Sequence, residues 1–236
     1  MAEEQPRIVV GTNGPYRVSG RVRLVRTAIV ETEFGEPIEW DEGPEFETPS
    51  SGLELCRCGK SSRKPFCDST HEREPFDGTE LADRAPSAER RIVYEGESVV
   101  MTDDRDLCTH AGFCGDRFTT VWVMIHQTDD PTVRERLMGM VSRCPSGRLA
   151  YSVPPSTQDE EPPFVPPSIG IEPNGPIWVR GGIPVESEDG TTYEVRNRMT
   201  LCRCGRSRNK PFCDGSHKFV GFEDPAMPKD AARSSG

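Results

Sequence analysis

The feature that most constrains this chain is a pair of nearly identical Cys/His segments, one near each end. The first Cys/His motif reads CRCGKSSRKPFCDSTH over residues 56–71, and the second Cys/His motif reads CRCGRSRNKPFCDGSH over residues 202–217. Both follow the spacing C-x-C-x8-C-x3-H without any difference in length. Segments so rich in Gly, Ser and Pro do not form regular elements, and four metal-binding side chains in each predict loops held by a metal centre.

The repetition extends beyond the motifs. NGPYRVSG begins at Asn13 and NGPIWVRGG begins at Asn174, and an aromatic residue follows each motif at the same distance, as Phe76 and Phe222. The copies are offset by 161 residues at the asparagines and by 146 residues at the motifs. The first copy therefore has about 15 extra residues, which we place in the acidic segment EFGEPIEWDEGPEFE. Two copies of a whole unit indicate a duplicated domain rather than a solenoid.

Composition limits the classes of protein that this chain can belong to. Hydrophobic residues make up 33% of the 236 residues, which favours small domains stabilised by something besides apolar burial. The net charge of −10 argues against binding to nucleic acid or to an anionic membrane. No apolar run approaches the ~20 residues of a membrane span. The start is acidic and lacks the pattern of a secretory signal, so we expect a cytoplasmic protein.

The nine cysteines fall into three groups of three. The odd number and the absence of a leader weigh against disulfides, and the grouping favours three metal sites. The groups are Cys56, Cys58 and Cys67, then Cys108, Cys114 and Cys144, and finally Cys202, Cys204 and Cys213.

Patterns of apolar residues and turn signals predict the local structure. Short strands are expected at residues 8–10, 21–30, 119–127, 148–153 and 192–195, with a hairpin over 90–102. Asp130 and Pro131 begin a helix whose apolar face is formed by Val133, Leu137 and Val141. Asp68 and Asp214 are predicted to cap short helices that carry His71 and His217.

The ligand spacing of the motifs leaves two kinds of metal site open. Structural zinc sites usually begin with C-x2-4-C, because a zinc knuckle needs at least two residues between its thiolates. The C-x-C of these motifs is tighter than that. It is compatible with two sulfurs on one iron of a cluster, with the later Cys and His on a second iron. The spacing therefore favours an iron–sulfur cluster over zinc.

The second motif resembles the CDGSH iron–sulfur domain family, the mitoNEET-like proteins, whose pattern is C-x-C-x2-S/T-x3-P-x-C-D-G-S/A/T-H. The second motif matches at Cys202, Cys204, Ser207, Pro211, Cys213, Asp214, Gly215, Ser216 and His217. The first motif matches at Cys56, Cys58, Ser61, Pro65, Cys67, Asp68, Thr70 and His71, and has Ser69 in place of the glycine. The resemblance implies a [2Fe–2S] cluster in each copy, held by three Cys and one His.

A histidine ligand has electrostatic consequences. Replacing one thiolate by a neutral imidazole makes the cluster less negative, which places its potential between those of plant-type ferredoxins and two-His Rieske centres. Because imidazole binds iron only when unprotonated, mild acid is expected to release the cluster. The motifs also carry basic residues, which either offset the cluster charge, dock an acidic redox partner, or belong to a solvated loop. They are Arg57, Lys60, Arg63, Lys64, Arg203, Arg206, Arg208 and Lys210.

The central group of cysteines has the spacing Cys108-x5-Cys114, followed after a helix by Cys144-Pro145. A four-iron ferredoxin motif would have another cysteine where Ala111 stands. The site is therefore either a [3Fe–4S] cluster or a [4Fe–4S] cluster with a ligand other than Cys, for which His110 is a candidate. The segment resembles the divergent single-cluster ferredoxins. His126 has no cysteine nearby in the sequence, which favours a structural or surface role.

Together these features predict a mainly β protein with an α+β part. Two small β-rich CDGSH domains form a pseudo-twofold unit within one monomer, and a ferredoxin-like module is inserted between them. The predicted boundaries are 1–88 and 169–223 for the two CDGSH domains, 89–153 for the ferredoxin-like domain, 154–168 for a Pro-rich linker and 224–236 for a flexible tail.

The expected function is electron transfer by three clusters, for a redox partner protein. The alternatives are cluster storage and transfer to an apo-acceptor, redox or pH sensing, and a zinc-binding interaction module. No catalytic constellation points to an enzyme, although the chain could serve one as a reductase component.

Overall fold

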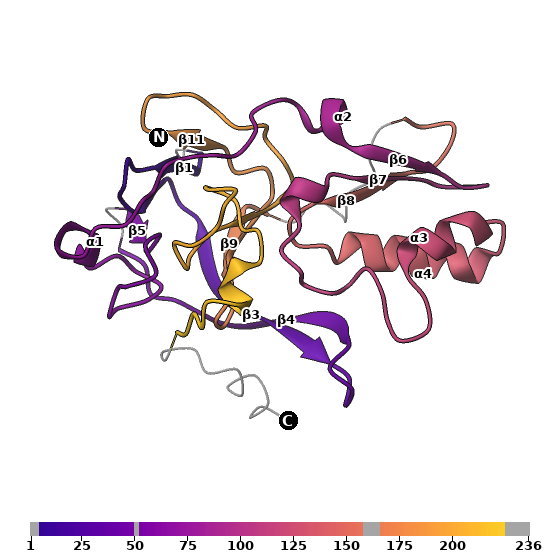
Figure 1. The fold of residues 1–236 in the computed structure, drawn as a ribbon, viewed down its shortest axis with the longest axis horizontal. Helices are drawn as coiled ribbons and strands as arrows, with labels where there is room; N and C mark the ends of the chain where they lie inside the picture. The colour runs from indigo at the N-terminus through magenta and orange to yellow at the C-terminus, as the bar shows by residue number, and fades with distance from the viewer. Residues whose placement is uncertain (1–4, 50–51, 158–165, 225–236) are drawn as a thin grey trace.

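The computed structural model describes residues 5–49, 52–157 and 166–224 of the chain. It places the two copies together on one side and the central module on the other (Figure 1). The strands of the first copy are β1 (Arg7–Val10), β2 (Tyr16–Ser19), β3 (Arg23–Glu31), β4 (Pro37–Glu45) and β5 (Leu53–Leu55). Those of the second copy are β9 (Ser168–Ile171), β10 (Ile177–Arg180), β11 (Val185–Ser187) and β12 (Arg198–Leu201).

The two copies exchange strands. One sheet has the order β11-β1-β2-β5 and the other has the order β12-β10-β9-β3-β4. The first sheet therefore contains β11 from the second copy, and the other contains β3 and β4 from the first copy. β11 pairs in parallel with β1, and β3 pairs in parallel with β9. Under the repeat offset, β1, β2 and β5 correspond to β9, β10 and β12, and β3 corresponds to β11. The copies therefore form one pseudo-twofold unit, which confirms the predicted fold class.

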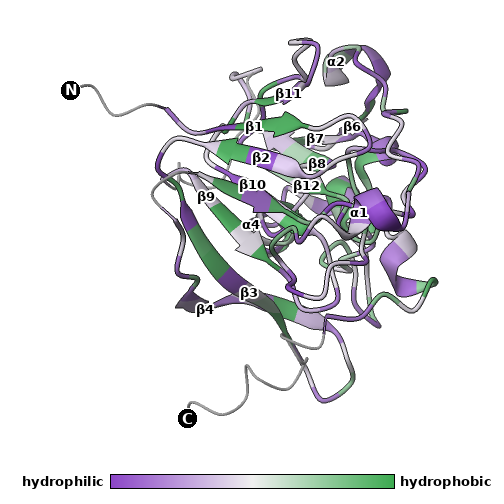
Figure 2. Ribbon diagram, turned by 90° about the vertical axis from the view of Figure 1, so that its left-hand side faces the viewer, coloured by the Kyte–Doolittle hydropathy of each residue, from purple (hydrophilic) through white to green (hydrophobic). Residues whose placement is uncertain are grey.

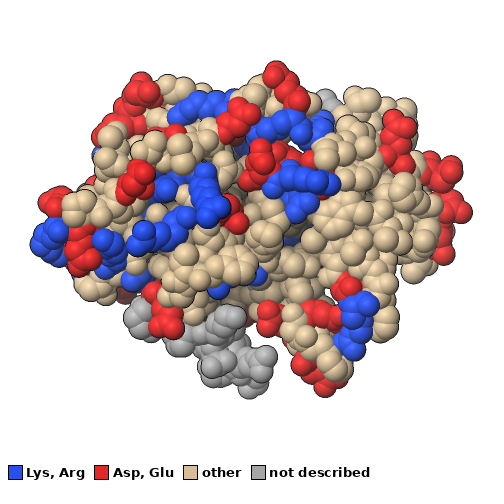
Figure 3. Space-filling model, in the orientation of Figure 1, with Lys and Arg blue, Asp and Glu red and all other residues tan. Residues whose placement is uncertain are grey.

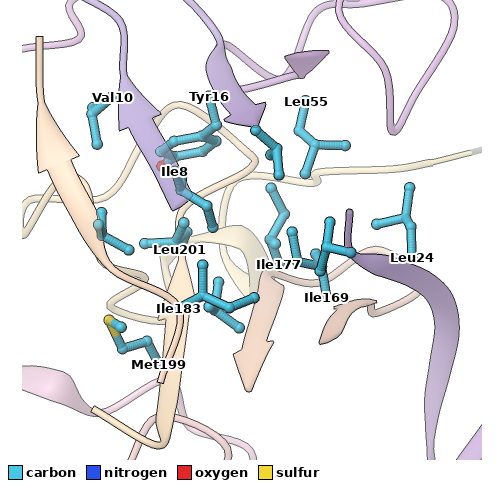
Figure 4. Packing of buried hydrophobic residues seen from close by; sticks show 14 of the residues in the cluster. Ile8, Val10, Tyr16, Leu24, Leu55, Ile169, Ile177, Ile183, Met199 and Leu201 are labelled. Atoms are coloured by element: carbon cyan, nitrogen blue, oxygen red, sulfur yellow. The ribbon is translucent and has the colours of Figure 1, made fainter. Parts of the chain in front are cut away.

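Apolar residues of both copies form a single core between these sheets (Figure 4). Ile8, Tyr16 and Leu24 from the first copy pack with Ile169 and Leu201 from the second, all at most 1% exposed. In the hydropathy view, apolar residues concentrate on the strands of these sheets (Figure 2). Because each copy buries its strands against the other, neither could bury the same apolar area alone.

The extra acidic residues of the first copy form β4 and its turn, and they reach the central module. The Trp40 indole on β4 donates to the carbonyl of Arg143 at 2.9 Å. Its ring centroid lies 4.5 Å from that of Trp178 and 5.2 Å from that of Phe113. The insertion therefore ties the central module to both copies.

The central module is a three-stranded antiparallel sheet with helices packed on it. Its sheet has the order β6-β7-β8, and its main helix α4 begins where Asp130 accepts a hydrogen bond from the Thr132 amide at 2.7 Å. Leu137 and Val141 on α4 are fully buried, as the sequence pattern predicts. The elements are α2 (Ser87–Arg90), β6 (Ile92–Glu95), β7 (Val100–Asp103), η1 (Arg105–Leu107), α3 (Val121–Met124), η2 (Ile125–Gln127), α4 (Pro131–Ser142) and β8 (Leu149–Ser152).

Two strand predictions are wrong. Residues 121–127 are helical rather than extended, because Val121, Met124 and Ile125 are buried with a helical spacing in the core under α4. Residues 192–195 do not extend into a strand, because their ladder pairing is limited to one isolated bridge between Thr192 and Glu186 of β11.

The ends of the linker and tail also differ from expectation. Ser168, assigned to the Pro-rich linker, lies in β9, while residues 158–165 lie outside the described residues. Asp224, assigned to the tail, is 1% exposed, and residues 225–236 lie outside the described residues. None of the helices over the described ranges has the length and apolar character needed to cross a membrane.

Candidate metal centres

Each Cys/His motif is a loop closed onto the strand that precedes it. The amide of Cys56 donates to the carbonyl of Pro65, and that of Cys202 donates to Pro211, both at 2.8 Å. The loop therefore returns beside its own start, which brings the third cysteine back to the first two. The same bonds in both copies explain why the motifs have identical lengths.

Asp68 and Asp214 organise the turn before each histidine, although they are not the N-caps that the sequence predicts. Asp68 accepts from the amides of Ser62 and Thr70 at 2.9 and 3.0 Å. Asp214 accepts from Arg208 and Ser216 at 2.8 and 2.9 Å. Each carboxylate thus joins the middle of its loop to the turn that leads into the histidine.

The N-cap positions are instead taken by the next residues along the chain. They are Ser69 before α1 (Thr70–Arg73) and Gly215 before η3 (Ser216–Lys218), and both have a left-handed backbone. These short helices carry His71 and His217, as predicted.

The donor atoms lie in pairs. The two sulfurs of the C-x-C segment are 3.8 Å apart in each motif, as Cys56 with Cys58 and as Cys202 with Cys204. The Sγ of Cys67 lies 3.6 Å from the Nδ1 of His71, and the equivalent pair Cys213 and His217 is 3.4 Å apart. With a metal–sulfur bond of about 2.3 Å, two ligands on one tetrahedral metal lie about 3.6–3.8 Å apart. The pairs therefore fit two ligands on each of two irons.

A single metal ion requires a tighter arrangement. Zinc in a structural site is surrounded by four ligands at one point. Across the described parts of the chain, no three His, Cys, Asp or Glu side chains converge closely enough to hold one ion. The close donor contacts within each motif are the two pairs described above.

Local hydrogen bonds prepare one thiol of each C-x-C pair for metal binding. Donation by the Cys58 thiol, with the backbone amides of Ser61 and Gly59, lowers the pKa of Cys56 to about 6. The equivalent bonds lower the pKa of Cys202 to about 6. The thiolate is the form that binds metal, so these contacts favour ligation near neutral pH.

The second histidine is held in its neutral form. Burial, followed by the charges of Lys218 and Arg203, lowers the pKa of His217 to about 4. Neutral imidazole is the form that coordinates a metal. The electrostatics of this motif therefore favour the ligand form of His217.

Two of the basic residues in the motifs are not solvated. Arg57 and Arg203 are each 1% exposed. Arg57 Nη1 donates to the carbonyl of Gly11 at 2.9 Å, and Arg203 Nη2 donates to the equivalent carbonyl of Glu172 at 2.7 Å. These arginines join each motif to the turn before its second strand.

The copies differ in how the arginine charge is balanced. Arg203 forms a fully buried ion pair with Asp224. The equivalent position in the first copy is Gly78, whose carbonyl accepts from Arg57. Arg57 Nε has no hydrogen-bond partner among the described residues. The first motif therefore has less charge compensation than the second, which its nearly identical sequence does not predict.

The two motifs approach one another closely at their glycines. A Cβ on Gly59 would lie 2.6 Å from the carbonyl oxygen of Cys204, and a Cβ on Gly205 would lie 2.6 Å from that of Cys58. Both glycines also have positive φ, at +78° and +73°. The two metal sites therefore lie back to back about the pseudo-twofold axis.

The central cysteines surround one cavity of about 190 Å³, lined by Cys108, Cys114 and Cys144. His110 and Ala111 also line it. This places the candidate fourth ligand and the vacant position beside the three thiols. The donor set therefore fits a cluster with three cysteine ligands. His126 is exposed on η2 and is not among the residues that line the cavity.

A charged pair lies beside this cavity that no sequence pattern indicates. Arg148 lines the cavity, and its guanidinium contacts both oxygens of buried Asp103 at 2.6 and 2.9 Å. This contact raises the pKa of Arg148 above its ordinary value, which keeps it positively charged beside the thiols. An isolated Arg after Cys-Pro-Ser-Gly gives no signal for this role.

Two sites with paired sulfur and nitrogen donors, together with a cavity lined by three cysteines, define an iron–sulfur protein. The sequence matches the profile of the iron-binding zinc finger CDGSH type at residues 13–72 and 174–218. It matches that of the divergent 4Fe-4S mono-cluster at residues 94–154. The chain thus contains two CDGSH-type iron-binding domains that flank a divergent mono-cluster ferredoxin-like module. Neither a curated protein nor a solved structure matches it.

Proposed function

We propose that this protein is an electron carrier with three clusters. Two [2Fe–2S] clusters are held by the Cys/His motifs, and one [3Fe–4S] or [4Fe–4S] cluster is held by the central cysteines. The observation that carries the proposal is the pairwise arrangement of donors in both motifs. Such clusters accept and release single electrons without large changes in structure.

Backbone amides and buried cations support this role. The amide of Ser69 donates to Cys67 Sγ, and that of Gly215 donates to Cys213 Sγ, both at 3.4 Å. Hydrogen bonds to cluster sulfurs stabilise the reduced, more negative state. Arg57 lies between Cys56 and Cys58 in the chain and adds positive charge there, whereas the charge of Arg203, between Cys202 and Cys204, is compensated by Asp224. The chain therefore favours reduction at both motifs.

The surface near the first motif suits an acidic partner. Lys and Arg side chains lie on the face around α1 with acidic side chains among them (Figure 3), and Arg63 and Arg73 are exposed there beside Glu72 and Glu74. This local basic surface contrasts with the net charge of −10. Complementary charge steers protein association and raises its rate. We therefore expect a redox partner with an acidic docking surface and an association rate that falls with added salt.

Iron and sulfide analysis with EPR spectroscopy tests the proposal. Two two-iron clusters and a three-iron cluster give about seven irons per chain, and a four-iron centre gives about eight. An oxidised three-iron cluster is paramagnetic, whereas an oxidised two-iron cluster is EPR-silent. A signal before reduction, with about seven irons, identifies [3Fe–4S]. A colourless protein with stoichiometric zinc would exclude the proposal.

One observation favours a second candidate function, the delivery of clusters to an apo-acceptor. Cys67 and His71 in the first motif are half-buried, whereas Cys213 and His217 are 2% and 6% exposed. A more accessible cluster is easier to release by ligand exchange. The two candidates separate when the loaded protein is mixed with an apo-ferredoxin. Cluster transfer faster than electron transfer to an acceptor would favour delivery.

The intramolecular pairing of the copies leads us to propose a monomer. Each shared sheet already takes its exchanged strand from the same chain. A second chain is therefore not needed to complete either sheet. Light scattering tests this expectation, and a dimer mass would contradict it.

A further inference from the structure

The central module touches the second Cys/His motif through the loop of residues 106–110. The ring of His110 lies directly against Gly215. A Cβ added to Gly215 would stand 2.5 Å from His110 Cδ2 and 3.2 Å from the carbonyl oxygen of Thr109. The loop therefore rests on the backbone of the second motif at a point where an added side chain would require His110 to move.

Polar contacts reinforce this junction. The side-chain amide of Asn209 donates to the carbonyl of Asp106 at 2.7 Å, and Lys218 Nζ donates to the carbonyl of His110. The first motif has different residues at the positions that make these contacts. Arg63 stands for Asn209, Ser69 for Gly215 and Glu72 for Lys218. The contact surface is therefore a property of the second copy.

Ser69 and Gly215 stand at equivalent positions but have different neighbours. Ser69 has φ of 61° and Gly215 has φ of 81°, so both motifs use the same left-handed conformation. Glycine is favoured in this region, yet the first copy accommodates serine there. What distinguishes Gly215 is the His110 ring packed against it.

A second attachment holds the central module near Cys144. Arg198 on β12 is 3% exposed, and its guanidinium donates to four backbone carbonyls of the central module. One of these is the carbonyl of Cys144, at 2.7 Å. The others belong to Val141, Ser142 and Leu149. Because β12 leads directly into Cys202, the central cysteines and the second motif are held by one continuous set of contacts.

These contacts form a short route between two sets of ligands. His110 is two residues from Cys108, and its ring touches Gly215, whose amide donates to Cys213 Sγ at 3.4 Å. We propose that His110 is a positioning residue that couples the central cluster site to the second motif rather than to the first.

The proposal rests on the electron-carrier function. One electron leaves one site as the other gains it, and no atom or proton moves. A protein redox partner supplies the electron. Because the rate of electron tunnelling falls steeply with distance, a fixed contact between the central site and the second motif favours electron transfer to the second motif over the first.

The decisive variant is Gly215→Ser, which gives the second motif the residue that the first has at this position. The left-handed turn tolerates serine in the first copy, so the ligand loop is expected to remain loaded. The added side chain must displace His110. The matched control is Ser69→Gly, the reverse change in the first copy. His110→Ala removes the ring and leaves the second motif unaltered.

Hydrogen exchange of the purified protein tests the contact itself. Displacing a tightly packed ring weakens the local structure, so Gly215→Ser is expected to speed amide exchange across residues 106–112 by about tenfold or more. Ser69→Gly is expected to leave these residues unchanged. Equal exchange in the Gly215→Ser variant and the unaltered protein would overturn the contact.

EPR of the reduced, fully loaded protein tests the coupling. In the unaltered protein, the paramagnetic central site is expected to enhance the spin relaxation of the second-motif cluster. Gly215→Ser and His110→Ala should reduce that enhancement, and the line shape of the central signal should stay the same. A changed central line shape in His110→Ala would make His110 a ligand and overturn its positioning role.

The outcomes separate this inference from the function on which it rests. A loaded protein without relaxation enhancement between the central and second sites would overturn the coupling and leave the three-cluster proposal standing. Iron and sulfide analysis that finds no clusters would overturn the proposed function, and the coupling with it. The exchange measurement would still report on the contact.

Discussion

The close approach of the two Cys/His motifs leads to a prediction that tests the pseudo-twofold interface. Gly59→Ala adds a methyl group that would lie 2.6 Å from the carbonyl oxygen of Cys204. It also places alanine at a φ of +78°. Gly205→Ala is the symmetric change, with its methyl group 2.6 Å from the carbonyl oxygen of Cys58.

The magnitude follows from two separable costs. A positive φ costs a non-glycine residue about 1–2 kcal/mol. Overpacking against a backbone atom adds about 1–3 kcal/mol. For a chain of this length, each kcal/mol lowers the melting temperature by about 2–4 °C. Gly59→Ala is therefore expected to lower the apparent melting temperature by about 4–20 °C.

The matched control isolates the backbone cost. Gly35 has a φ of +77° but no atoms within 4 Å of the position of an added Cβ. Gly35→Ala should therefore lower the melting temperature by only about 2–8 °C. Differential scanning calorimetry of the loaded proteins, with iron content measured alongside, provides the comparison. Equal shifts for Gly59→Ala and Gly35→Ala would refute the close approach of the motifs.

Three further predictions concern single side chains. Asp224→Asn leaves the buried Arg203 charge uncompensated, so we expect the free energy of unfolding, measured by thermal denaturation, to fall by about 3–5 kcal/mol. A redox titration monitored by EPR should also give the second-motif cluster a higher reduction potential in the variant than in the unaltered protein. Unchanged stability and an unchanged potential would contradict the ion pair. Asp130→Ala removes the cap from Thr132, and the melting temperature should fall by an amount equal to about 1 kcal/mol. Trp40→Ala removes a half-buried ring between the copies and the central module. The free energy of unfolding should therefore fall by about 2–3 kcal/mol, which is less than the loss for a fully buried tryptophan. Faster amide exchange at residues 112–117 would check this last expectation, and unchanged exchange would speak against the role of β4.

Local patterns predicted the regular parts of the fold well. The 90–102 hairpin and the α4 helix follow from alternation and from the Asp130 cap, because these signals depend on neighbours within a few residues. Residues 121–127 were harder to assign, because a short apolar run suits a strand or a helix equally. Packing against α4 decides in favour of the helix.

The candidate metal sites show a similar division. The four donors of each motif lie close together in sequence, so their spacing alone points to a metal centre. Arg148 beside the central cavity and Asp224 beside Arg203 gave no such signal. Both act through partners far away in the sequence, and a single charged residue has no pattern to detect.

The sequence by itself determined the duplication and predicted the ligand set. Metal ligation depends on residue type and on short loop spacing, and the repeat can be read by aligning the chain with itself. Only the tertiary structure decided how the copies differ. Three features join segments that are distant in the sequence: the exchange of β3 and β11, the contact of His110 with Gly215, and the hydrogen bond from Arg198 to the carbonyl of Cys144. Such contacts depend on which surfaces meet when the chain packs, so two nearly identical motifs acquire different neighbours.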